Sequence, residues 1–346
     1  MRASLRFVRR LKCPKRKLVF CLLSVCLIIV PQHFNVTWSR PRAESGLLER
    51  EYITGERLLE LCDVLIYSAE YVRTYPAVRK HNSRVILLDV LLDDAQDETS
   101  RILIANSFSF FIKTDLIEEF KRVVLPLIHH NFVIVTHNSD DRSGVDDEIL
   151  KHPYLIRWYG QNMLPHAKTI GVPIGLENAD TWGRTDFHHV SKLANRAKTK
   201  LLYFQFSDST NEMRRGVREI LLKKGFKENQ PKDWRSYIDE LSQHRFCVAP
   251  PGNGIDTHRA WECIYLGVTP IMLRMDEMFH WFREVDILWV ESFEDISPQN
   301  LLDFRPTSQN ATIPNVAKLS FYREQINLDQ RKTLERASRW GKEGLP

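Results

Sequence analysis

Acidic residues are absent from the first 43 positions of this 346-residue chain, although the whole chain carries 44 of them. The same segment holds ten of the 49 lysines and arginines, so the remainder holds 39 basic and 44 acidic residues. The pI of about 8.8 therefore describes the amino-terminal tail, while the body of the protein is mildly acidic. This distribution disfavours a surface that coats DNA or RNA, but it allows a local basic pocket.

Cysteine is scarce, and no repeat or low-complexity tract is present. Three of the six cysteines lie in or beside an apolar run near the amino terminus. Only Cys62, Cys247 and Cys263 occur in the body, so at most one internal disulfide can form there. No spacing typical of zinc is found, and we predict no metal site. A hydrophobic content of 43% excludes a disordered chain, and the roughly 300 residues after the tail suit two domains.

The apolar run covers residues 18–30, carries no charge and follows eight basic residues. As a helix it would extend about 20 Å, and extension to residue 34 gives a length near the lower limit for a membrane span. No A-x-A-like cleavage site follows, which favours an uncleaved signal anchor over residues 18–34; a cleaved signal peptide is the alternative. The positive-inside rule then places residues 1–17 in the cytosol and the body in the lumen.

Two N-x-[ST] sequons agree with a lumenal body, because this pattern accepts N-glycans in secreted proteins. They predict glycosylation of Asn35 and Asn310. Residues 35–50 show little periodicity, and we expect them to form a stem between the anchor and the first domain.

Beyond residue 50, short apolar runs alternate with helical patterns in two series. The first series predicts strands over residues 64–67, 84–90, 102–106, 132–136 and 155–158, with a helix that starts near residue 114 and ends near Pro126. The second predicts strands over residues 201–206, 245–249, 268–273 and 287–290, with helices over residues 210–224, 234–243 and 257–266. Such alternation indicates α/β architecture with two doubly wound parallel sheets facing a cleft. We expect domains over residues 51–190 and 191–318, and a carboxyl-terminal helix within residues 319–346 that packs back on the first domain.

The most informative segment is residues 244–273, where a strand ends in a Pro-Pro-Gly-Asn-Gly loop. Asp256 or Thr257 can then cap a helix. In open α/β sheets, ligands bind at the carboxyl ends of strands, where glycines permit close approach and a helix N-terminus favours negative charge. We therefore expect Gly252, Asn253 and Gly254, together with Asp256, to contact an anionic ligand.

Charged side chains follow this loop at spacings suited to a nucleoside diphosphate. Arg259 lies in the first turn of the predicted helix and can bind a diphosphate in bidentate fashion, while Glu262 shares its face and can accept hydrogen bonds from ribose. Arg214 follows the first strand of the same domain and supplies a second phosphate ligand, although the sequence does not separate it from Arg215. The alternative interpretation is an ordinary turn with Arg259 and Glu262 as a surface ion pair.

The order of residues in this segment resembles that of the exostosin-like glycosyltransferases of family 47. Their strand–loop–helix–strand pattern is filled by Phe246, Pro250, Gly252, Asp256, Arg259, Trp261, Glu262, Gly267, Pro270 and Ile271. Similar blocks occur at residues 132–140, 158–162, 173–175 and 203–214, so the resemblance extends over most of the predicted domains.

This resemblance implies a GT-B architecture of two Rossmann-like domains, with the nucleotide sugar bound mainly by the second. It also implies an inverting, metal-independent transferase in the Golgi lumen, anchored as a single-pass type II membrane protein, that moves a sugar from a UDP-sugar to a glycan or glycoprotein hydroxyl. The lack of any Asp-x-Asp agrees, because metal-dependent GT-A transferases use that pair to bind Mn²⁺. A non-catalytic lumenal partner of another transferase is the alternative, whereas a sulfotransferase is disfavoured because no phosphate-binding loop follows residues 64–67.

An inverting transfer needs one base to take the proton of the acceptor hydroxyl. Asp140 follows a strand of the first domain and is the first candidate for this base. His137 follows the same strand and is the second candidate. Gln161, Asn162 and Glu177 lie in polar loops of that domain and are expected on the acceptor side. A nucleotide sugar is thus the expected co-substrate, and no other cofactor is expected.

Overall fold

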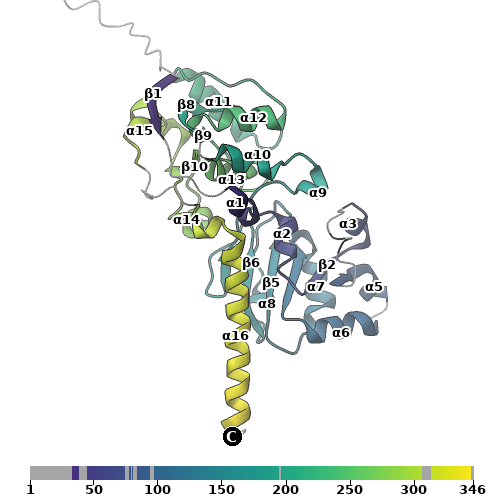
Figure 1. Ribbon diagram of the computed structural model, residues 1–346. Helices are drawn as coiled ribbons and strands as arrows, with labels where there is room; N and C mark the ends of the chain where they lie inside the picture. The colour runs from purple at the N-terminus through teal and green to yellow at the C-terminus, as the bar shows by residue number, and fades with distance from the viewer. Residues whose placement is uncertain are drawn as a thin grey trace, which may run out of the picture. The chain divides into compact units, whose positions relative to one another are not determined.

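The computed structural model describes residues 33–38, 45–74, 78, 80, 84–93, 97–194, 196–305 and 313–343. Its elements form an α/β protein with two sheets built mainly of parallel strands, which confirms the expected class (Figure 1). The expected cytosolic tail, nearly all of the expected anchor and the sequon at Asn310 lie outside the described residues. Within the described ranges, no helix combines the length and apolar character needed to cross a membrane.

The first sheet has six parallel strands in the order β3-β2-β4-β5-β6-β7. Continuous apolar runs make its central strands buried on both faces, as parallel sheets require. The strands are β2 (Val64–Tyr67), β3 (Val85–Leu87), β4 (Ser109–Lys113), β5 (Phe132–His137), β6 (Leu155–Gly160) and β7 (Thr169–Gly171). The helices of this part are α2 (Gly55–Leu59), α3 (Ala69–Thr74), α5 (Leu88–Asp93), α6 (Glu98–Asn106), α7 (Ile117–Val123) and α8 (Asp147–Lys151).

The second sheet has the order β1-β8-β9-β10-β11, in which β8 to β11 run parallel. Its strands are β1 (His33–Trp38), β8 (Lys198–Tyr203), β9 (His244–Val248), β10 (Thr269–Leu273) and β11 (Leu288–Val290). The helices are α9 (Ala179–Trp182), α10 (Phe187–Leu193), α11 (Met213–Lys223), α12 (Trp234–Leu241), α13 (His258–Leu266), α14 (Asp276–Phe282) and α15 (Pro298–Asp303). The expected domain boundary between residues 190 and 191 falls within helix α10, whose Val190 packs in the core beside this second sheet.

One expected strand is wrong. Residues 102–106 belong to helix α6, and the strand of this region is β4, seven residues further along the chain. The side chain of Asp97 accepts a hydrogen bond from the Ser100 amide, so a capped helix begins there and continues through the short apolar run. A run of that length fits a strand and a buried helix equally well, and here the cap decides.

The expected stem also differs from the structure. Strand β1 pairs antiparallel with β8, and residues Ser45–Glu51 form helix α1. The edge of β8 would otherwise present unpaired backbone groups, which β1 covers. His33 and Phe34, the last two residues of the expected anchor, belong to this strand. Asn35 lies in the same strand, of which only the backbone is described.

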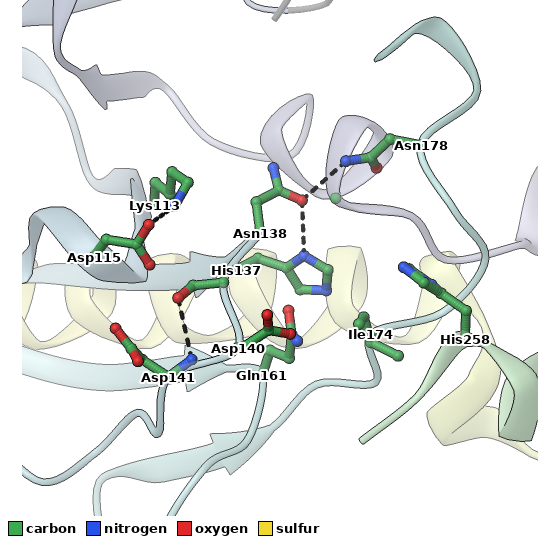
Figure 2. A pocket seen from close by; sticks show the side chains of 12 residues that line it. Lys113, Asp115, His137, Asn138, Asp140, Asp141, Gln161, Ile174, Asn178 and His258 are labelled. Atoms are coloured by element: carbon green, nitrogen blue, oxygen red, sulfur yellow. Dashed lines mark hydrogen bonds and ion pairs between the residues drawn. The ribbon is translucent and has the colours of Figure 1, made fainter. Parts of the chain in front are cut away.

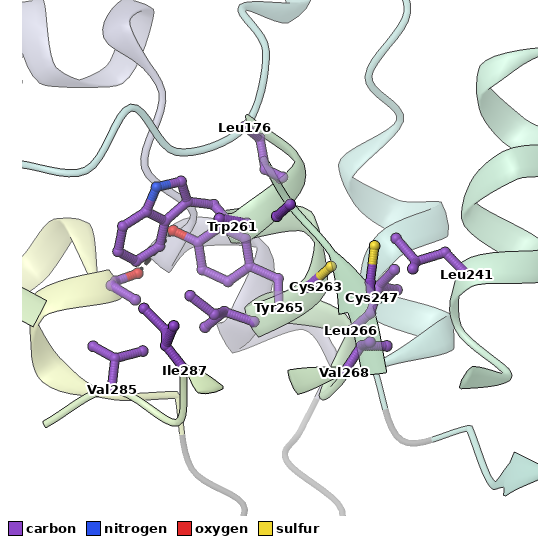
Figure 3. Close-up of a cluster of buried hydrophobic side chains, with 14 of the residues drawn as sticks. Leu176, Leu241, Cys247, Trp261, Cys263, Tyr265, Leu266, Val268, Val285 and Ile287 are labelled. Carbon is purple, nitrogen blue, oxygen red and sulfur yellow. Dashed lines mark hydrogen bonds between the residues drawn. The ribbon is translucent and has the colours of Figure 1, made fainter. Parts of the chain in front are cut away.

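The core beside the second sheet gathers side chains of α13 and its neighbouring strands (Figure 3). Trp261 and Tyr265 of α13 are fully buried in it, next to Cys247 of β9 and Cys263 of α13. Cys62, Cys247 and Cys263 are all buried and free, so the disulfide that the sequence permitted does not form among them. Cys247 and Cys263 are packing residues, as the sequence indicated.

Helix α16 (Leu319–Glu343) packs against the first sheet (Figure 1). Leu319, Tyr322 and Ile326 are buried in the core on that side of the sheet. The hydroxyl of Tyr159 in β6 donates a hydrogen bond to Asp329 of the helix at 2.6 Å. The expectation that the carboxyl-terminal helix returns to the first domain is confirmed.

Candidate functional site

Two neighbouring cavities lie at the carboxyl ends of the parallel strands. The smaller has a volume of about 330 Å³ and the larger about 500 Å³. Asp140, Ile174 and His258 line both of them, so the cavities adjoin. The structure brings together in the smaller cavity every residue expected on the donor side: Arg214, Gly252, Asn253, Gly254, Asp256, Arg259 and Glu262.

The loop between β9 and α13 forms the floor of the smaller cavity. Pro250 and Pro251, which follow Ala249 just past the end of β9, have no amide hydrogen to continue the ladder. The chain then turns tightly, with the Gly252 amide donating to the Gly254 carbonyl oxygen at 3.0 Å. Helix α13 begins at His258 and ends at Gly267, whose φ of 68° suits a glycine. The sequence predicted this strand, loop and helix within one residue.

Arg214 and Arg259 bring two guanidinium groups to the same cavity. Arg214 donates to the Pro251 carbonyl oxygen at 2.9 Å, and Arg259 donates to the Gln205 carbonyl oxygen. Neither arginine forms an ion pair with a carboxylate in the described part of the chain. Burial, and then the charge of Arg259, lower the pKa of Arg214. Arg215 is exposed and lines neither cavity, which separates it from Arg214.

Glu262 is held in place by helix α12. Its two carboxylate oxygens accept hydrogen bonds from the Trp234 indole at 3.1 Å and the Tyr237 hydroxyl at 2.7 Å. Asp233 caps that helix by accepting from the Ser236 amide. Each oxygen of Glu262 keeps a lone pair for a ligand hydroxyl. The alternative surface ion pair with Arg259 is not formed, because Glu262 is only 7% exposed and faces α12.

Asp256 turns its carboxylate towards the protein. The carboxylate accepts hydrogen bonds from the Ile174 amide at 2.7 Å, the Thr257 amide at 2.8 Å and the Trp261 indole at 2.7 Å. Burial raises the pKa of Asp256 to about 7. The carboxylate therefore ties the segment after β7 to the start of α13, and its contact with a ligand would be secondary to that role.

Asn162 has a similar joining role. Its amide nitrogen donates to the Asp140 carbonyl oxygen at 3.1 Å, and its amide oxygen accepts from the Asp256 amide at 3.2 Å. The φ of 50° at Asn162 is a left-handed conformation that asparagine tolerates. Asn162 and Glu177 were both expected on the acceptor side, but neither is among the residues that line the two cavities. Glu177 is half-buried, and burial raises its pKa.

Gln161 lines the larger cavity, as expected of an acceptor-side residue (Figure 2). Its side chain is 1% exposed, and neither amide atom has a hydrogen-bond partner within the described ranges. On another wall of the cavity, Lys113 is 5% exposed and forms an ion pair with Asp115.

The two candidate bases have different surroundings (Figure 2). His137 is 2% exposed, and its Nε2 lies 3.0 Å from the Pro173 carbonyl oxygen. A carbonyl oxygen only accepts, so Nε2 carries the proton. Burial lowers the pKa of His137 to about 4, and its ring is therefore neutral at pH 7. Asp140 is exposed and lines both cavities, whereas His137 lines only the larger one.

His258 is a third candidate that the sequence did not reveal. Its Nδ1 lies 2.9 Å from the Gly175 carbonyl oxygen, which fixes the proton on Nδ1 and leaves the lone pair on Nε2. The residue opens helix α13 and lines both cavities. Its position directly after a glycine-rich loop and a capping residue is the signal that could have indicated it.

A comparison with protein-family models finds no match, and a comparison with the sequences of curated proteins finds none either. No group of three or more His, Cys, Asp or Glu side chains able to hold a metal ion occurs among the residues that the structure describes.

Proposed function

We propose that this protein is a GT-B glycosyltransferase that moves a sugar from a nucleotide diphosphate to a hydroxyl group of a glycan or glycoprotein. The resemblance to exostosin-like enzymes favours a UDP-sugar donor, inversion at the anomeric carbon and no essential metal. The two sheets with parallel strands and the return of α16 to the first sheet support this architecture. We further propose that the body lies in the Golgi lumen behind a signal anchor, as the basic tail and the apolar run of the sequence favour.

One observation carries the proposal: Arg214 and Arg259 line one cavity, and neither forms an ion pair with a carboxylate among the residues that the structure describes. Two like charges brought together on carbonyl hydrogen bonds are costly unless an anion binds between them. A diphosphate fits, because guanidinium groups bind phosphate oxygens in bidentate fashion. Glu262, beside them, would accept the ribose hydroxyls.

The two arginines that bind the diphosphate would also stabilise the leaving group of the transfer reaction. As the bond between the sugar and the diphosphate breaks, negative charge grows on the leaving phosphate oxygen, and Arg214 and Arg259 stabilise it. The acceptor enters from the larger cavity, and its hydroxyl loses a proton to a base at the wall that the cavities share. Asp140 and His258 both lie on that wall, while His137 is set back in the larger cavity.

The first test measures donor binding by the purified full chain. UDP should bind, and Arg214→Ala or Arg259→Ala should weaken UDP binding at least tenfold, since each removes one charge-assisted contact. Arg215→Ala is the matched control and should bind UDP as the wild type does, because Arg215 is exposed outside the cavity. Equal affinity of all four proteins would refute the donor site.

The second test identifies the base. Loss of a general base typically costs about 10²–10⁴ in kcat, so one of Asp140→Asn and His258→Gln should lose that much. Both variants keep the backbone contacts of the position, and His137→Gln serves as the comparison inside the larger cavity. The measurement is sugar transfer, or donor hydrolysis where no acceptor is known. A transferase in which all three variants keep full activity would contradict this assignment of the shared wall.

A further inference from the structure

The larger cavity contains a buried amide that no protein group satisfies. Gln161 is 1% exposed, and both its Oε1 and Nε2 lack a hydrogen-bond partner among the described residues. An amide presents an acceptor and two donors, and leaving them unpaired in a buried site is unfavourable. A ligand with neighbouring hydroxyl groups, each able to donate and accept, would satisfy both ends at once.

The charges around Gln161 are mainly negative (Figure 2). Asp140 and Asp141 line the cavity and are exposed, and neither is engaged in an ion pair in the described part of the chain. The one lysine, Lys113, is already paired with Asp115, and its ammonium lies 4.5 Å from the centroid of the Tyr71 ring. Among its described lining residues, the cavity therefore has acceptors for ligand hydroxyls but no lysine or arginine outside an ion pair to bind a ligand anion.

The remaining ionisable groups do not change this balance. His137 is neutral at pH 7, because burial lowers its pKa to about 4. His258 holds its Nδ1 proton on the Gly175 carbonyl oxygen. A carboxylate, sulfate or phosphate placed here would face Asp140 and Asp141 in a partly desolvated space, where like charges repel more strongly than in water.

We propose that the larger cavity binds an uncharged sugar through its hydroxyl groups, with the Gln161 amide bonded to two of them, and that it excludes acidic sugars. This inference rests on the proposed function, in which the cavity receives the acceptor. It specifies the class of that acceptor: a neutral glycan residue rather than a uronate or a sulfated or phosphorylated sugar.

The test uses the full chain and immobilised glycans in matched sets that differ only in a carboxylate or sulfate. Neutral members should bind and their acidic counterparts should not. Gln161→Ala should weaken binding of neutral glycans at least fivefold and leave UDP affinity unchanged. Gln299→Ala is the matched control, since Gln299 is exposed and its side chain donates a hydrogen bond to Asp303, away from the two cavities.

A second variant tests the charge argument without touching the buried amide. Asp141 is exposed, so Asp141→Asn should fold normally and shift the ratio of acidic to neutral glycan binding at least threefold towards acidic glycans. Preference of the wild type for acidic glycans, or wild-type binding by Gln161→Ala, would overturn the proposal. A chain that binds UDP but no glycan would also overturn the proposal of a neutral-sugar site, while the proposed donor site would still be supported. Glycan binding without UDP binding would refute the proposed function alone.

Discussion

Asp256 shows how much one buried carboxylate can do without touching a ligand. Three N–H donors from two parts of the chain converge on it, and it is 3% exposed. Its pKa is nevertheless raised to about 7, because the loss of hydration outweighs these hydrogen bonds. A carboxylate in this state makes the stability of the fold depend on pH.

Proton linkage gives the direction in which the free energy of unfolding changes with pH. Between pH 4 and 7 the folded chain keeps on Asp256 a proton that the unfolded chain has lost, so this residue's contribution to stability falls as the pH rises through that window. His137 and His244, whose pKa values burial lowers to about 4, act in the opposite direction between about pH 4 and 6.5. A comparison with Asp256→Asn cancels their effect.

We expect the free energy of unfolding of the wild type, relative to that of Asp256→Asn, to fall by on the order of 2–3 kcal/mol between pH 5 and pH 8. Urea unfolding followed by circular dichroism at both pH values measures this difference. Parallel pH profiles of the two proteins would show that Asp256 ionises normally in the folded state.

At the scale of elements, the segment after β7 positions the site. Gly175 lies in it with a φ of 69°, and its carbonyl oxygen orients His258. A Cβ added at Gly175 would lie 2.1 Å from the carbonyl oxygen of Ile53. Gly183 has nearly the same φ, 67°, but a Cβ there would meet nothing within 4 Å. A comparison of alanine substitutions at the two glycines therefore separates the cost of the left-handed backbone from the cost of the steric clash with Ile53.

Gly183→Ala should therefore lower the free energy of unfolding only by the cost of the left-handed conformation, about 1–2 kcal/mol. Gly175→Ala should cost at least about 2 kcal/mol more, because the backbone of Ile53 must move as well. Thermal unfolding of both variants measures the difference, and the proposed transfer activity should fall only in Gly175→Ala. Equal shifts of the melting temperature would show that the segment can adjust freely.

The individual helices and strands also show how much of the fold the sequence could predict. Strands that are continuous apolar runs between turns, such as β2 and β5, were predicted within one residue, and so were β9 and helix α13. The strand expected over residues 102–106 is wrong because an apolar run of that length does not distinguish strand from helix, and the Asp97 cap that starts helix α6 lies outside the run. Within the site, the loop after β9 could be identified because its glycines and charges lie close together in sequence.

His258 could not be found in the same way. Its orientation depends on Gly175, which lies 83 residues earlier in the chain. The roles of Asp256 and Asn162 likewise depend on partners 82 and 94 residues apart in sequence. A pattern of residue types indicates which side chains gather at a strand end. It does not indicate which of those side chains already form hydrogen bonds with distant parts of the fold.

For the whole molecule, α16 and α13 connect the parts built on the two sheets. The Tyr265 hydroxyl of α13 accepts from the Ile53 amide at 3.1 Å and donates to the Ala317 carbonyl oxygen at 2.9 Å, just before α16. The Trp281 indole of α14 donates to the Met163 carbonyl oxygen at 2.7 Å. These buried contacts predict that the two sheets unfold together.

A chain that ends at residue 318 should test this directly. It loses Leu319, Tyr322 and Ile326 from the core of the first sheet and leaves the Tyr159 hydroxyl without Asp329. We expect a fall in melting temperature of more than about 10 °C or loss of soluble protein. A chain that ends at residue 335 keeps these contacts and is the control. Two separate unfolding transitions in the control would contradict the coupling of the sheets.

The wall shared by the two cavities has a thermodynamic consequence. Asp140, Ile174 and His258 line both cavities, so a ligand that shifts them in one cavity would alter the affinity for a ligand in the other. Linkage makes this effect reciprocal: the factor by which the first ligand changes the binding of the second equals the factor in the reverse order. Under the proposed function, any coupling between donor and acceptor would pass through this wall, and the spent nucleotide would change the affinity for the product by the same factor as the product changes the affinity for the nucleotide.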